Sequence, residues 1–465
     1  MHPTNPDVLL AAVTDPPDQG GVYMTHDSGD TWERILTGPQ GMDAVEIAVS
    51  NPDVWYAATE DLIWRSDDAG QTWQEFQMRT ADRNAGFPID LQVDPRDPYR
   101  IFVNNYSGGN MLSTDGGQTW VDASQGYTGA HIGGLGVSPT DASHVIAGSN
   151  TASFASHDGG QAWTGLLFNR LESVVFFWPD AQRGTPYALA GDNGGRVWHS
   201  SDGGTTWESV QVVDLAAETR AGHLDADHHA LRALAVAPSD PQIVYAGFVF
   251  YEGIRGHFSY ALARSAGFHR STDGGYTWEH VTGIPFEQTA ILGIAVHPDD
   301  SQTLYVATAE GLYLSRDGGD SWEALDGLDS AVFPLVTDLE YYPTTRPMVY
   351  DVLLDPFDPQ VVYVATIQGG AFRSTDGGTT WAQVAAGMDP NEALYDLVAD
   401  PNRPGVLYAS SWYSGVFVTT DSGDTWRQIA NGLDMKGMRQ LALSADGSVL
   451  YAATIARGVY RLGTP

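Results

Sequence analysis

Nine aspartates recur at one place in an eight-residue motif, Ser/Thr-x-Asp-x-Gly-x-Thr-Trp. Repeated carboxylates could bind cations or exchange protons in acid–base catalysis. Calcium loops place several carboxylates on one ion, whereas each copy of this motif has one constant aspartate. An aspartate can also accept turn N–H groups, and the glycine permits an unusual backbone conformation. We therefore expect a structural role for all nine: Asp27, Asp68, Asp115, Asp158, Asp202, Asp273, Asp317, Asp376 and Asp421.

One segment has the residue types of a metal site. His223, His228 and His229 lie in a run that also contains two aspartates, and histidine with aspartate can bind zinc. Their spacing matches no specific site pattern, so a solvated loop is the favoured interpretation. The sequence therefore predicts neither a metal nor another cofactor, and the chain has no cysteine for thiol chemistry.

The motif marks the elements that position everything else. Its tryptophans are mostly 41 to 47 residues apart, with two longer gaps of 71 and 59 residues. The unit 45–76 contains four short apolar segments, bounded by Pro-Asp, a short turn and the motif. Four such segments predict an antiparallel four-stranded sheet, and a period of this length predicts an array of sheets. The expected fold is an all-β propeller with the motif between its third and fourth strands.

The blade count depends on the two ends of the chain. Second and third strands occur ten times, whereas first and fourth strands occur nine times. Residues 1–3 align with 296–298 at the end of a first strand, and the sequence stops after a third strand. We expect residues 1–465 to form one propeller domain of ten blades, or nine if the terminal strands merge. The short first blade suggests a trimmed start, so localisation stays open, and secretion remains compatible with the missing signal pattern.

The repeated motif resembles the Asp box of the bacterial neuraminidase repeat. This element recurs in sialidases, xyloglucan-active glycosidases, photosystem II assembly-factor-like proteins and sortilin-type receptors. The resemblance covers essentially the whole chain and implies a propeller, but it does not imply one activity. Ten blades would be similar to the sortilin-type receptor, although the cysteine-rich modules of that receptor are absent here.

Composition limits the partners. The formal net charge is −35, which disfavours nucleic acid and anionic membranes. No apolar stretch is long enough for a membrane helix. The expected partner is a glycan, peptide or protein, and the expected state is a monomer.

Strand order assigns the turns to two faces. The box face carries the Asp boxes and the turns between first and second strands. The loop face carries the turns between second and third strands and the links between blades. All long insertions fall on the loop face, which predicts that this face is functional.

Candidate ligand-binding residues follow from that face. An aromatic ring there can stack on a sugar, a carboxylate can accept hydrogen bonds, and an arginine can bind a carboxylate. The candidates are Trp412, Tyr413, Tyr251, Glu252, Asp15, Arg83, Arg232 and Arg346. Edge packing by Trp412 and salt bridges from the arginines are the alternatives.

Two functions remain open. The preferred hypothesis is a non-catalytic propeller that binds its partner on the loop face or in the central channel. The alternative is a glycoside hydrolase that uses two loop-face carboxylates. Tyr251 and Glu252 are neighbours and would point apart on a strand, which disfavours a sialidase pair. Residues 14–15 and 20–23 faintly resemble the first blade of xyloglucan-active enzymes. We expect binding without turnover and assign no catalytic residue.

Overall fold

The computed structural model describes most of the chain. The described ranges are 1–14, 19–38, 41–59, 61–79, 88–105, 110–123, 132–149, 153–166, 171–179, 184–214, 229–250, 267–287, 289–332, 346–367, 369–389, 391–429, 436–455 and 457–464. Within these ranges nearly all regular structure is strand, with one α-helix, α2 (Asp326–Val332). None of the described helical structure is long and apolar enough to cross a membrane.

The described strands form ten sheets, which confirms the predicted all-β fold and the predicted number of sheets. Eight sheets have four strands, and the first and last have three. The first sheet lacks its first strand and the last lacks its fourth, as the strand count predicts. Each Asp box lies between the third and fourth strands; one example is the turn between β6 (Leu62–Ser66) and β7 (Gln74–Gln77).

Contacts divide the chain into two compact units. The smaller is Met1–Ala130 with Ser149–Ser153 and Thr164–Phe168, and the larger is the rest. Each unit is described by itself, and one domain for residues 1–465 stays a prediction. The first three sheets contain β1 (Leu9–Val13), β2 (Gly21–Thr25), β3 (Glu33–Leu36), β4 (Ala44–Ile47), β5 (Trp55–Thr59), β6, β7, β8 (Pro88–Val93), β9 (Ile101–Asn105), β10 (Asn110–Ser113) and β11 (Val121–Asp122).

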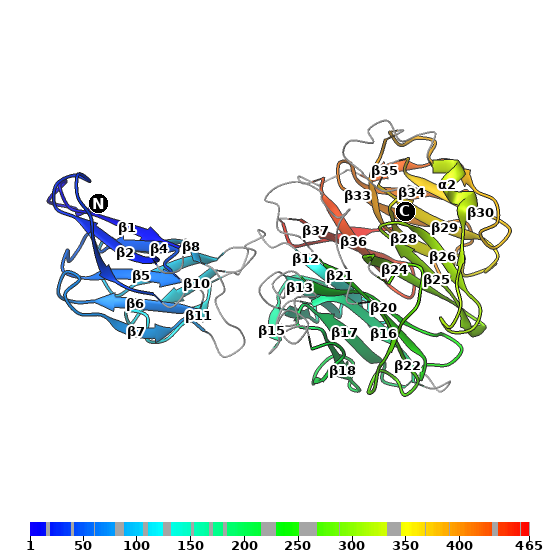
Figure 1. Ribbon diagram of the computed structural model, residues 1–465, viewed down its shortest axis with the longest axis horizontal. Coiled ribbons are helices and arrows are strands. Elements are labelled where there is room, and N and C mark those ends of the chain that lie inside the picture. Colours follow the sequence, from blue (N-terminus) through cyan, green and yellow to red (C-terminus); the bar gives the residue numbers. More distant parts are fainter. Residues whose placement is uncertain are drawn as a thin grey trace. The chain divides into compact units, whose positions relative to one another are not determined.

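The other seven sheets follow in chain order (Figure 1). Their strands are β12 (Ile132–Val137), β13 (Val145–Ser149), β14 (Ser153–Ser156), β15 (Thr164–Leu166), β16 (Leu171–Phe177), β17 (Tyr187–Asp192), β18 (Arg196–Ser200), β19 (Glu208–Gln211), β20 (His229–Val236), β21 (Val244–Phe250), β22 (Phe268–Ser271), β23 (Glu279–Val281), β24 (Ile291–His297), β25 (Asp300–Thr308), β26 (Gly311–Ser315), β27 (Glu323–Ala324), β28 (Val349–Leu354), β29 (Val362–Thr366), β30 (Ala371–Ser374), β31 (Ala382–Gln383), β32 (Leu394–Ala399), β33 (Leu407–Ser411), β34 (Gly415–Thr419), β35 (Arg427–Ile429), β36 (Met438–Leu443), β37 (Val449–Thr454) and β38 (Val459–Gly463).

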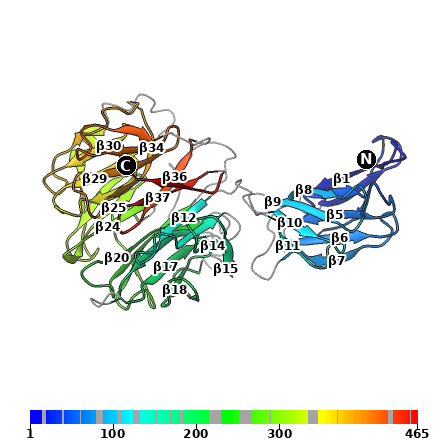
Figure 2. The ribbon, with the colours of Figure 1, turned by 180° about the vertical axis from the view of Figure 1, so that it is seen from behind.

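The innermost strands of these seven sheets close a ring. Each of β12, β16, β20, β24, β28 and β32 contacts the innermost strand of the next sheet, and β36 contacts β12. Figure 2 shows β12, β20, β24 and β36 gathered around the middle of this unit. Tyr451 on β37 adds to the closure by donating a hydrogen bond to the carbonyl of Ala142 at 2.8 Å. The tenth sheet therefore joins the fourth.

The core lies between neighbouring sheets. Several second strands, such as β5, β13, β29 and β33, are buried along their length, because a sheet covers each face. One interface packs Tyr305 and Leu312 against Val352 and Phe372. The fourth strands are largely exposed, as in β7. The inner strands are therefore held in fixed positions, and their side chains can form a defined site.

Candidate functional site

The nine Asp boxes share one hydrogen-bond pattern. In the box at Ser374, the serine hydroxyl donates to Asp376 at 2.8 Å and accepts the N–H of Gly378. Asp376 also accepts the N–H and hydroxyl of Thr380, at 2.8 and 2.6 Å. These bonds lower the pKa of Asp376 to about 2. The carboxylate thus fixes a turn on the box face, and a structural role for the boxes remains our interpretation.

The inner strands carry a bulge at one repeated position. In six sheets of the larger unit, the pairing between first and second strands skips one residue near the start of the first strand. A bulge redirects the side chain of the extra residue. We call these residues the ring-centre cluster: Glu172, Arg232, Leu292, Tyr350, Tyr395 and Arg439.

An aromatic series runs from this cluster toward the loop face. The rings of Tyr350 and Tyr395 have centroids 4.1 Å apart, and Tyr395 stacks on Trp412 at 5.2 Å. Trp412 is partly buried against an apolar cluster that also contains Leu292. Trp412 therefore packs at the edge of the aromatic series, although its backbone lies in the loop-face turn between β33 and β34.

Tyr413, the next residue, is presented to solvent. Its side chain is 58% exposed. The hydroxyl of Ser411 accepts the N–H groups of Tyr413 and Ser414, both at 3.0 Å. Both serines donate to the buried carboxylate of Glu392, Ser414 at 2.9 Å. This network holds the turn in one conformation, so Tyr413 is an exposed ring on a rigid support.

Arg232 lies at the other end of the aromatic series. Its guanidinium carbon is 5.9 Å from the centroid of Tyr350, a cation–π distance, and its Nε has no hydrogen-bond partner among the described residues. The charge of Arg232 also reaches the carboxyl groups of Asp351 and Asp396. Arg232 and Trp412 are thus connected through Tyr350 and Tyr395, and Tyr413 is the next residue in the turn that carries Trp412.

Asp351 and Asp396 form a carboxyl pair on adjacent inner strands. Asp351 accepts the N–H of Leu397 at 3.0 Å, and Asp396 accepts the N–H of Leu441 at 2.6 Å. Burial raises the pKa of Asp351 to about 6. Burial and the charge of Asp351 raise the pKa of Asp396 well above its ordinary value. Two such carboxyl groups share a proton near neutral pH.

One predicted arginine, Arg346, and one arginine of the ring-centre cluster, Arg439, are engaged in ion pairs. Arg346 contacts Asp329 at 2.7 Å and Asp326 at 3.1 Å, and its guanidinium carbon lies 4.9 Å from the ring centroid of Tyr313. Arg439 is buried beside Glu172, with 3.2 Å between the two charged groups. These contacts favour the salt-bridge interpretation for both arginines over binding of an external carboxylate.

Other predicted residues lie outside the described residues. They are Asp15, Arg83, Tyr251, Glu252, His223 and His228, together with the side chain of His229, whose backbone begins β20. The insertions 80–87, 215–228, 251–266 and 333–345 are outside them too. In the described ranges, no three His, Cys, Asp or Glu side chains gather as a metal site.

Five residues near the ring centre were not predicted from the sequence: Tyr350, Tyr395, Asp351, Asp396 and Glu172. The sequence does contain a signal for most of them. Tyr350 and Tyr395 each lie six residues before the proline of the following turn, and the aspartate after each tyrosine lies five residues before it. Arg232 has the same offset as the two tyrosines. Aligning the first strands on that proline would have placed these residues on one ring.

The comparisons with known proteins agree on the type of fold. A family model described as "Sortilin, neurotensin receptor 3" matches residues 20–132. A xyloglucanase of a Paenibacillus species is 24% identical over 386 residues, which are 76% of this chain and 32% of the relative. The vacuolar protein sorting/targeting protein 10 of Coccidioides posadasii is 28% identical over 136 residues, 27% of this chain and 9% of the relative.

A solved xyloglucanase structure from Xanthomonas campestris aligns with 100% of this chain, and the alignment covers 84% of the xyloglucanase chain. The sequence identity is 17% and the TM-score is 0.30. The chain spans about a third of the length of the Paenibacillus xyloglucanase and of the xyloglucanase Xgh74A of Acetivibrio thermocellus. The family match and these relatives support a β-propeller of the sortilin and xyloglucanase type, as the sequence predicts.

Proposed function

We propose that the loop face of the larger unit binds a neutral polysaccharide, with Tyr413 as an exposed contact. The observation that carries this proposal is the 58% exposed ring of Tyr413, which follows Trp412 in a turn fixed by Ser411 and Glu392. A rigid aromatic side chain offers a large apolar face at little entropic cost, which suits stacking on a sugar ring.

Charge selects among glycans. The chain has a net charge of −35, so an acidic polysaccharide would be repelled. A neutral glycan is not repelled, and its hydroxyl groups can form hydrogen bonds with polar groups at the rim of the loop face. The xyloglucanase names of several relatives make xyloglucan the first neutral polymer to test.

Hydrolysis of such a polymer is the second candidate, favoured by the same names. Three described carboxylates near the ring centre are already engaged: Glu172 pairs with an arginine, Glu392 accepts two serine hydroxyls, and Asp351 shares a proton with its neighbour. A catalytic pair would therefore use carboxylates other than these three.

The test is titration calorimetry of the full chain with xyloglucan oligosaccharides, alongside a reducing-end assay on the polymer. We expect Tyr413→Ala to weaken binding at least tenfold. Phe357→Ala is the matched control, because Phe357 is 49% exposed in a box-face turn. Equal affinity of wild type and Tyr413→Ala, or no binding of any neutral glycan, would overturn the proposal and favour a peptide partner. New reducing ends would establish hydrolysis.

A further inference from the structure

Four sheets carry a tyrosine on the second strand directly opposite an arginine on the third. The pairs are Tyr56 and Arg65, Tyr245 and Arg270, Tyr363 and Arg373, and Tyr451 and Arg461. Each tyrosine hydroxyl donates to a backbone carbonyl of a neighbouring sheet; one example is Tyr245 to Ser301 at 2.9 Å. The pairs therefore join adjacent sheets on the box face.

Three of these arginines bind a carbonyl in the Asp box of the next sheet. Arg270 donates to the carbonyl of Gly318 at 2.9 Å and forms ion pairs with Asp320 at 2.9 Å and Glu279 at 3.0 Å. Arg65 and Arg373 donate to the corresponding carbonyls at 3.1 and 2.7 Å. At each of these junctions a guanidinium is thus held by a box carbonyl beside carboxylate or amide side chains.

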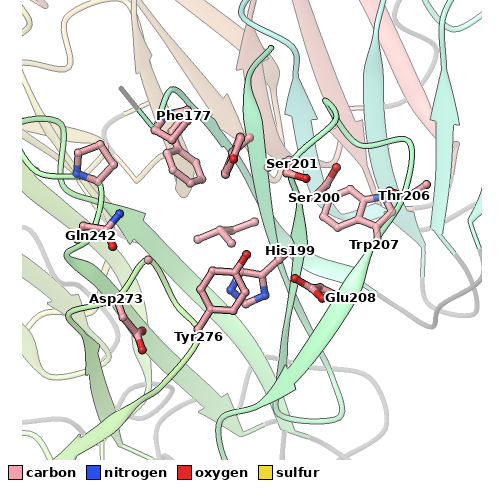
Figure 3. Close-up of a pocket in the computed structure, with 16 residues that line it drawn as sticks. Phe177, His199, Ser200, Ser201, Thr206, Trp207, Glu208, Gln242, Asp273 and Tyr276 are labelled. Atoms are coloured by element: carbon pink, nitrogen blue, oxygen red, sulfur yellow. The ribbon is translucent and has the colours of Figure 1, made fainter. Parts of the chain in front are cut away.

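The sheet β16–β19 lacks this pair. Leu189 and His199 occupy the opposed positions. Leucine has no hydroxyl, and histidine is too short to reach as an arginine does. A pocket of about 420 Å³ lies at this junction, with Leu189 and His199 in its wall (Figure 3). The two positions that hold the Tyr–Arg pair in four other sheets therefore lie in the wall of this pocket.

The pocket contains the counterparts of the groups that bind the arginine guanidinium at the next junction. Gly274 corresponds to Gly318 in the box, and Glu208 corresponds to Glu279 at the start of the fourth strand. Both line the pocket, and none of its lining residues is a lysine or arginine. In the part of the chain that the structure describes, Glu208 has no ion pair, in contrast to Glu279.

Tyr276 supplies an aromatic wall. It occupies the box position of Asp320 and is the one aromatic residue at that position among the nine boxes. Its ring stacks on His199 at 4.5 Å and is 47% exposed. Figure 3 shows Tyr276, His199 and Glu208 side by side at the pocket. An exposed tyrosine face beside a carboxylate attracts a planar cation.

His199 leaves the site without a cation of its own. It is 5% exposed, and its ring lies against the backbone of Gly274, Gly275 and Glu208. Burial lowers the pKa of His199, so the ring is neutral at pH 7. The carboxylate of Glu208 accepts the hydroxyl of Tyr276 and, within the described residues, faces the pocket without a cation beside it.

We propose that this pocket binds a guanidinium group, supplied by an arginine side chain of a peptide or by a free arginine derivative. The guanidinium would bond to the carboxylate of Glu208 and the carbonyl of Gly274, with Tyr276 along its edge. The bound guanidinium would thus make the same two contacts, with a box carbonyl and a carboxylate, that Arg270 makes at the next junction. The site is on the box face, so it is independent of the proposed polysaccharide site.

The experiment is titration calorimetry of the full chain with the peptide Ac-Gly-Arg-Gly-NH2, its citrulline and lysine counterparts, and arginine amide. Citrulline has nearly the shape of arginine without the charge. We expect the arginine peptide to bind at least tenfold more tightly than the citrulline or lysine peptide. Arginine amide of equal affinity would identify a free guanidino compound, and a tighter peptide would identify a peptide partner.

Variants make the test specific. His199→Arg should place the chain's own guanidinium in the site, abolish peptide binding and raise Tm. Glu208→Gln should weaken binding at least tenfold, whereas Asp299→Asn removes an exposed charge elsewhere and should change little. Tyr413→Ala should bind the peptide normally, which separates this proposal from the polysaccharide proposal. Equal binding of the arginine and citrulline peptides, or undiminished binding by His199→Arg, would overturn it.

Discussion

Glu172 on β16 and Arg439 on β36 form a buried ion pair at 3.2 Å, although 267 residues separate them in the sequence. Strand β12 lies between their two strands in the ring. Gly133 on β12 gives the pair its room, since a Cβ there would lie 3.0 Å from the carboxyl carbon of Glu172. The pair thus spans the sheets at which the ring closes.

Removing one partner should destabilise the larger unit strongly. Arg439→Met leaves the buried carboxylate of Glu172 without its cation, which costs about 3–5 kcal/mol. Thermal unfolding of the full chain should show this loss, and Glu172→Gln in the same chain should recover part of it. Arg316→Met is the control, because the ion pair of Arg316 with Glu323 is exposed and is worth about 1 kcal/mol or less. Equal effects of the two arginine variants would contradict the prediction.

The carboxyl pair of Asp351 and Asp396 should make stability depend on pH. Both pKa values are raised, Asp351 to about 6, so the folded state binds more protons than the unfolded state above about pH 4. This contribution is complete below about pH 4 and is lost as the pH rises through 6. We expect Tm to rise as the pH falls from 8 to 5.

An amide provides the control for this pair. Asp396→Asn can donate a hydrogen bond to Asp351 and removes the repulsion between two carboxylates. The variant should have a higher Tm than wild type at pH 8, and its Tm should change little between pH 8 and 5. A wild-type profile that is already flat over this range would refute the shared proton.

The Asp boxes should respond to pH in the opposite sense. Asp376 has its pKa lowered to about 2 by bonds from Thr380 and Ser374. Its contribution is therefore present above about pH 4 and is lost as the pH falls through 2. Asp376→Asn should lower Tm by a few degrees at pH 7 and reduce the loss between pH 4 and 2, as measured by circular dichroism. An Asp299→Asn control should leave both quantities unchanged.

The repeat made the blades predictable, because a local pattern of short apolar strands and a self-contained turn specifies each sheet. Ten sheets and two incomplete terminal sheets follow from that pattern. Closure between β12 and β36 could not be predicted, since it depends on contacts between strands about 300 residues apart in the sequence. No local motif in either strand records that contact.

The site was predictable only in part, for a related reason. Trp412 and Tyr413 stand out because aromatic residues in a short turn are unusual, and the structure exposes Tyr413. Tyr350 and Tyr395 look like ordinary strand residues, and a bulge, which backbone pairing alone reveals, brings them together. Arg346 looked available for a ligand because its carboxylate partners lie 17 and 20 residues earlier in the chain.

Arg346 should hold the one described helix in place. Its guanidinium bonds to Asp329 and Asp326 of α2 at 2.7 and 3.1 Å, and it lies over the ring of Tyr313 on β26. Lysine keeps the charge but cannot contact two carboxylates and a ring face in the same geometry. Arg346→Lys should therefore speed amide hydrogen exchange across 326–332 at least tenfold. Arg316→Lys, in an exposed pair, should not, and unchanged exchange in Arg346→Lys would show that packing of Leu328 and Val332 holds the helix alone.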